Sequence, residues 1–154
     1  MTGPDPTPFP LDHLARRGEP GAQALIAGEE QLTYAELEQA IGRAASALLE
    51  HGLRPGDRVA TWMGKTRLAC VMPLAAARAG LVHVPINPVL KHAQAAHILA
   101  DSGAKLLIAN RARLESLAKG DLADAKAVPL EAWQDGDEAL SQSSRDPDEL
   151  VALF

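Results

Sequence analysis

The stretch LTYAELEQAIGRAASALLEHGLRPGDRVA, residues 32–60, decides the fold class because it contains one complete helix together with the signals that begin and end it. Thr33 followed three residues later by Glu36 is the pattern of a capping box, in which each side chain bonds the other residue's backbone N–H. Apolar residues then recur at helical spacing, at Leu37, Ile41, Ala44, Ala45 and Leu48. Gly52 suits the left-handed position that ends a helix, and Pro55-Gly56 suits a type II turn. The stretch therefore predicts an amphipathic helix and a turn, followed by a strand from Val59.

Short apolar strands and helices alternate on both sides of this stretch. The expected strands cover residues 24–26, 31–33, 59–63, 81–85, 105–109, 127–129 and 150–154. The other expected helices cover residues 11–17, 66–79, 91–101 and 111–119, and Pro73 should kink its helix or force a later start. Such alternation predicts an α/β fold, a mainly parallel sheet flanked by helices on both faces.

The chain divides into two parts of different composition. Prolines at positions 4, 6, 8 and 10 prevent a helix, so residues 1–10 are expected to form a flexible tail. Residues 11–154 form one predicted α/β unit, in which residues 131–147 are polar and irregular.

Composition excludes several classes of protein. The 154 residues carry a net charge of −5 with no basic run, which argues against nucleic acid as a partner. A single cysteine, Cys70, cannot form an intramolecular disulfide, and its apolar surroundings favour a buried hydrophobic role. No signal peptide and no apolar run of about 20 residues is present, so no membrane span is expected, and a cytoplasmic location follows by default.

Gly64-Lys65-Thr66 lies between a predicted strand and a predicted helix, where a phosphate-binding loop would end. That loop also needs a glycine six residues before the lysine, and Val59 stands there. We therefore interpret these residues as an ordinary turn between a strand and a helix.

Other reactive side chains do not form a recognisable site. His92 and His97 are five residues apart and so do not share a helix face; His83, in an apolar strand, is expected to be a core or edge residue. Asp135, Asp137 and Glu138 lack the further oxygen ligands of a calcium loop, which favours a solvated loop. We assign no catalytic, cofactor-binding or metal-binding residue.

Three blocks in order resemble the AMP-forming acyl-CoA synthetases, a family within the acyl-adenylating superfamily. The first is residues 32–60, with its Thr-Tyr-x-Glu-Leu helix start and Gly-Asp-x-Val-Ala. The second is PLAAARAGLVHVPINPVLK, residues 73–91, and the third is HILADSGAKLLIA, residues 97–109. PINPVLKHAQAAHIL, residues 85–99, looks closest to the exosortase-associated acyl-CoA ligases.

The resemblance implies a two-step parent reaction. A carboxylate attacks the α-phosphorus of ATP to give acyl-AMP and pyrophosphate, and a thiol such as coenzyme A then displaces AMP. ATP, Mg²⁺ and coenzyme A are the implied cofactors of the parent, and fatty acid metabolism is its implied setting. In the family, a Ser/Thr/Gly-rich phosphate loop directly follows a strand similar to ELVALF, residues 149–154, whereas this sequence stops at Phe154. We therefore expect an N-terminal subdomain, truncated before that loop, with no cofactor of its own and no catalysis alone.

Two further expectations concern partners. Apolar surface that the rest of a ligase would cover, above all the strand at residues 150–154, should promote self-association. The alternative is a free-standing, non-catalytic binding or assembly module on the same scaffold.

Overall fold

The computed structural model describes residues 7–154. Its helices and helical turns are η1 Leu11–Arg17, α1 Tyr34–Glu50, α2 Arg67–Ala79, α3 His92–Ser102, α4 Arg111–Glu115, η2 Lys119–Leu122 and η3 Leu130–Ala132. Its strands are β1 Gln23–Ala27, β2 Glu30–Thr33, β3 Arg58–Trp62, β4 Val82–Pro85, β5 Leu106–Ala109 and β6 Lys126–Pro129. Of the expected tail, residues 1–6 lie outside the described residues, and residues 7–10 have no regular structure.

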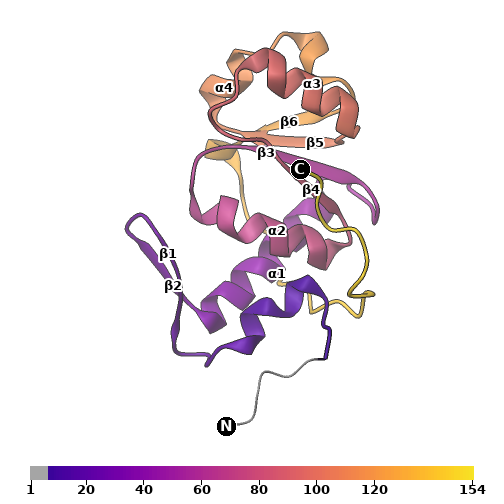
Figure 1. Ribbon diagram of the computed structural model, residues 1–154. Helices are drawn as coiled ribbons and strands as arrows, with labels where there is room; N and C mark the ends of the chain where they lie inside the picture. The colour runs from indigo at the N-terminus through magenta and orange to yellow at the C-terminus, as the bar shows by residue number, and fades with distance from the viewer. Residues whose placement is uncertain (1–6) are drawn as a thin grey trace.

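A parallel sheet of four strands in the order β4-β3-β5-β6 forms the centre of the molecule (Figure 1). At the β4 edge, Ala152 adds a single parallel bridge to His83. Strands β1 and β2 form a separate antiparallel hairpin, which projects away from the sheet in Figure 1. The α/β class and the mainly parallel sheet are confirmed.

Side chains of each strand alternate between two cores, one on each face of the sheet. Val59 of β3 and Ile108 of β5 pack against α1 and α2 in the larger core. Ala60 of β3 and Leu107 of β5 pack against α3 in the smaller core. Helices therefore cover both faces of the sheet, as the alternating sequence pattern predicted.

Helix α1 begins and ends as the sequence predicts. The Thr33 hydroxyl accepts a 3.2 Å hydrogen bond from the N–H of Glu36, and the Glu36 carboxylate accepts a 2.8 Å bond from the N–H of Thr33. Gly52 follows the helix at a φ of +91°, and Gly56 takes the same angle in the next turn. The apolar face of α1 contacts α2, and both lie on the same side of the sheet.

Two elements differ from expectation, and a third agrees in its bounds. The helix expected at residues 111–119 is only five residues long, Arg111–Glu115. Helix α2 agrees with the expected range, since it begins at Arg67 after the N-cap Thr66; of the two effects expected of Pro73, the later start is not observed. The expected buried strand at residues 150–154 is reduced to the bridge at Ala152, and Phe154 is fully exposed because no further strand of the described chain covers that edge.

Within residues 7–154, none of the helices combines the length and apolarity that crossing a bilayer would require.

Candidate functional site

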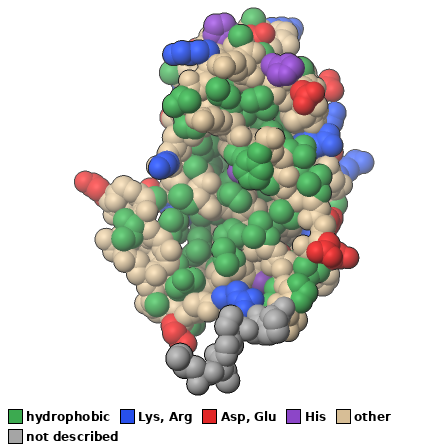
Figure 2. All heavy atoms as spheres, viewed as in Figure 1, with side chains coloured by type: hydrophobic (Ala, Val, Ile, Leu, Met, Phe, Trp, Pro, Cys, Tyr) green, Lys and Arg blue, Asp and Glu red, His purple; other side chains and the backbone are tan. Residues whose placement is uncertain are grey.

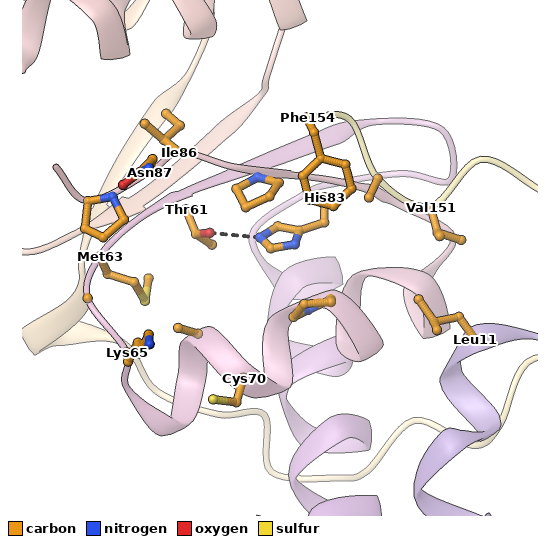
Figure 3. Close-up of a pocket in the computed structure, with 16 residues that line it drawn as sticks. Leu11, Thr61, Met63, Lys65, Cys70, His83, Ile86, Asn87, Val151 and Phe154 are labelled. Atoms are coloured by element: carbon orange, nitrogen blue, oxygen red, sulfur yellow. Dashed lines mark hydrogen bonds between the residues drawn. The ribbon is translucent and has the colours of Figure 1, made fainter. Parts of the chain in front are cut away.

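A cavity of about 700 Å³ opens at the carboxyl ends of β3 and β4 (Figure 3). Helix α2 forms one wall, through Cys70 and Pro73, and the segment from Val151 to Phe154 forms another. The described residues that line this cavity include no aspartate or glutamate, and most of them are apolar. Its volume falls within the range of about 300–1,000 Å³ that is usual for ligand pockets.

A buried hydrogen bond is the main polar feature of this cavity. Thr61 Oγ1 and His83 Nε2 lie 2.8 Å apart, and His83 is 3% exposed. Burial lowers the pKa of His83 to about 4, because desolvation penalises the charged imidazolium. His83 is therefore neutral at pH 7, and among the described residues no Asp or Glu side chain lines the cavity to favour the charged form.

Two residues singled out in the sequence also line the cavity. Lys65 is exposed at its rim and forms no ion pair within the described part of the chain. Cys70 is exposed, so the expectation of a buried hydrophobic role is wrong. The apolar face of α2 turns toward α1, whereas Cys70 lies on the opposite face, which the described residues leave open.

Gly64-Lys65-Thr66 is a turn that starts a helix. The Thr66 hydroxyl accepts a 3.2 Å hydrogen bond from the N–H of Ala69, which makes Thr66 the N-cap of α2. The Thr66 N–H itself donates to the carbonyl of Gly64, 2.9 Å away. These two N–H groups are bonded within the chain, as expected for an ordinary turn between a strand and a helix.

The remaining candidates are not brought together. His92 and His97 are exposed on α3, on the far side of the sheet from the cavity. Asp137 and Glu138 are exposed in an irregular segment, while Asp135 forms a 3.3 Å ion pair with Arg67. Within residues 7–154, no cluster of three or more His, Cys, Asp or Glu side chains could hold a metal ion.

The structure contains a buried ion pair that the sequence did not predict. Arg78 Nε and Asp12 Oδ2 lie 3.1 Å apart, and both side chains are 1% exposed. Arg78 also reaches Glu38, and Ser143 donates to Asp12 through its N–H and its hydroxyl. Burial alone would raise the pKa of Asp12, but these bonds outweigh it and hold the pKa below 3.8. Asp12 and Arg78 lie far apart in sequence, so spacing could not reveal the pair.

Together, the fold and the cavity define a class: a parallel α/β unit whose candidate site lies at the carboxyl ends of its strands, where such sheets bind ligands. The family model of the AMP-binding enzymes matches residues 12–152, and this chain belongs to that family.

Known proteins of this family resemble the chain over part of their length. A feruloyl-CoA synthase from an Amycolatopsis species is 42% identical over 123 residues, which is 77% of this chain and 25% of that protein. A mitochondrial medium-chain acyl-CoA ligase from Bos taurus is 37% identical over 100 residues, 64% of this chain and 16% of that protein. The first curated relatives therefore extend well beyond the match, since the chain spans a quarter of their length or less.

A solved structure agrees with the fold. The crystal structure of apo MatB from Rhodopseudomonas palustris superposes with a TM-score of 0.78 at 26% identity. The match covers 95% of this chain and 32% of MatB. The described α/β unit thus corresponds to one section of the longer MatB chain.

Proposed function

We propose that this chain is the N-terminal section of an ATP-dependent acyl-CoA ligase. The observation that carries the proposal is 42% identity to a feruloyl-CoA synthase across 77% of the chain. In the proposed parent, a carboxylate and ATP give acyl-AMP and pyrophosphate, and coenzyme A then displaces AMP. The parent would need ATP, Mg²⁺ and coenzyme A. This section would help to form the wall of the acyl pocket.

The test of the parent activity begins with the gene. Sequencing downstream of the Phe154 codon should show an open frame that continues into Thr/Ser/Gly-rich sequence. Protein made from that frame should catalyse carboxylate-dependent exchange of pyrophosphate into ATP. An intact frame whose product shows no exchange with a broad panel of aryl and alkyl carboxylates would contradict the proposal.

The chain alone is proposed to be inactive, because charge on phosphate oxygens must be stabilised by positioned donors and a cation. In the turn at residues 64–66, the N–H of Thr66 is bonded to the carbonyl of Gly64, and the Thr66 hydroxyl is bonded to the N–H of Ala69. Isothermal titration of the 154-residue chain with MgATP should therefore give no low-micromolar binding. Such binding, or turnover by the chain, would refute the proposal.

Finer assignments are also part of the proposal. The sequence of residues 85–99 supports the exosortase-associated subgroup of acyl-CoA ligases. A role in fatty acid metabolism and a cytoplasmic location would follow from such a parent. The free chain should self-associate, because Leu150 is 54% exposed and Phe154 is fully exposed beside an incompletely paired edge. Light scattering across a concentration series tests this, and a constant monomer mass would count against it.

One observation favours the alternative, a free-standing binding or assembly module. The cavity of about 700 Å³ has the size that is usual for ligand pockets, which a binding module would need. This alternative predicts a stop codon directly after the Phe154 codon.

A further inference from the structure

The cavity beside α2 lies where part of the sheet face is not covered by another element. Met63 and the Thr61–His83 pair lie on the α2 side of the sheet, but α2 reaches them from one side only (Figure 3). Hydrophobic side chains gather over this face of the molecule (Figure 2). Phe154, which lines the cavity, is fully exposed. Contiguous exposed apolar surface of this kind usually marks a surface that another element covers.

The handedness of the chain indicates which element would cover it. Connections between parallel strands are right-handed, so the direction of a step along the sheet fixes the face on which its connection lies. The step from β3 outward to β4 places α2 on one face, and the opposite steps, β4 to β5 and β5 to β6, use the other face. The return from β6 to the β4 edge again uses the first face, where Gly136 and Leu140 donate to α1 carbonyls.

The same rule applies to the segment beyond the sheet edge. Ala152 pairs in parallel with His83, which makes its segment the next position outward from β4. A further parallel strand outside it would continue the direction of the step from β3 to β4. Its connecting helix would therefore lie on the α2 face, over the cavity.

We propose that this cavity holds an apolar helix from the section of the parent ligase that follows Phe154. This inference rests on the proposed function. Relatives supply the length, since about two thirds of MatB lies outside the match. Small side chains on the exposed wall of α2, Ala69 and Cys70, allow a neighbouring helix to approach closely.

One polar contact in this cavity is available to the occupant. His83 bonds Thr61 through Nε2, and Nδ1 has no hydrogen-bond partner within the described residues. His83 lines the cavity, so this nitrogen can bond a polar side chain of whatever fills it. The occupant should thus present an apolar stripe with one polar side chain.

A second copy of this chain fits less well. Two copies related by a two-fold axis would pair their edge strands with each other, antiparallel. Such pairing extends the sheet but supplies no connecting helix, so the cavity would remain open in the dimer.

Cys70 provides the test, because it is the single cysteine and lines the cavity. Residues 1–154 are fused to the remainder of the Amycolatopsis feruloyl-CoA synthase, starting at the position aligned after Phe154. Iodoacetamide labelling of Cys70 is then followed on the tryptic peptide of residues 68–78, in the fusion and in the 154-residue chain. Ile26, 59% exposed on the β1–β2 hairpin, is changed to cysteine as the matched control in both proteins.

The expected result is that labelling of Cys70 slows about tenfold or more in the fusion, since the helix must first lift away. Labelling at Ile26→Cys should be unchanged. Equal labelling rates of Cys70 in the two proteins would overturn the inference. Slow labelling of Cys70 that is seen only when the 154-residue chain self-associates would also overturn it.

A second variant checks the same contact by another route. Cys70→Trp should leave the melting temperature of the free chain unchanged, because the side chain is exposed there, and should lower that of the fusion. Ile26→Trp should change neither, and equal effects of Cys70→Trp in both proteins would contradict the inference. ATP–pyrophosphate exchange by the fusion distinguishes the covering helix from the proposed function. Protection of Cys70 without exchange would support the covering helix and oppose the proposed ligase function. Exchange with an accessible Cys70 would support the ligase function and oppose the covering helix.

Discussion

Neutral His83 should make the stability of this chain depend on pH in a predictable way. The pKa of His83 is about 4 in the folded chain and near 6.5 in an exposed reference state. Between these values the unfolded chain binds the proton and the folded chain does not, so stability is present above pH 6.5 and is lost as pH falls toward 4. One pKa unit corresponds to about 1.4 kcal/mol, so the loss between pH 7.5 and pH 5 should be about 2 kcal/mol.

The perturbation that isolates this effect is His83→Gln, which cannot titrate but can still hydrogen-bond Thr61. Urea unfolding of both proteins at pH 7.5 and pH 5, at low concentration because the pI is near 5.5, gives four free energies of unfolding. The pH-dependent loss should be smaller in the variant by about 2 kcal/mol. His51, whose pKa burial also lowers, cancels in this difference because it is common to both proteins.

The result that would refute the reasoning is a pair of parallel pH profiles. The same loss in the wild-type chain and in His83→Gln would mean that His83 is not held neutral by burial. The carboxyls with a lowered pKa, Asp12, Glu36 and Glu131, do not imitate the effect, because they are common to both proteins and cancel in the difference.

Three further predictions concern stability, each measured by urea unfolding at pH 7.5. Arg78→Met should lower the free energy of unfolding by about 3–5 kcal/mol, because it leaves the buried Asp12 carboxylate without its charged partner. Asp12→Asn combined with Arg78→Met should lower it by less than the sum of the two single changes. Additive losses would show that the pair is not coupled. Thr33→Ala should cost about 1 kcal/mol through loss of the α1 cap, while Thr33→Ser restores it; equal losses in both would contradict the capping role. Gly80→Ala should cost about 1–2 kcal/mol, because Gly80 has a φ of +75° and a Cβ there would meet the Arg145 side chain; no loss would argue against the left-handed conformation.

Local signals made most of the fold predictable. The capping box at Thr33 and the glycine after α1 act over a few residues, so sequence spacing was enough to place the helix. Strand identity was equally local, and alternating helices and strands implied the parallel sheet. Strand order was not local, since the step from β4 across β3 to β5 depends on packing of both faces.

The cavity could not have been predicted for the same reason. Thr61 and His83 come from neighbouring strands, and their hydrogen bond depends on the parallel register that sets Val59 opposite His83. The number of residues between Thr61 and His83 does not indicate that register. Exposure of Cys70 likewise depends on which elements fail to cover α2, which an apolar sequence context cannot indicate.

The contacts of Asp12 have a consequence for how the protein is made. Its carboxylate leaves the ribosome well before the N–H and hydroxyl of Ser143 that bond it, which lie 131 residues further along the chain. Until then a charged group destined for the interior must stay hydrated, since burying it with only part of its partners is costly. Docking of the Leu11–Arg17 segment therefore waits until Ser143 has left the ribosome, and the nascent polypeptide carries this segment undocked until then.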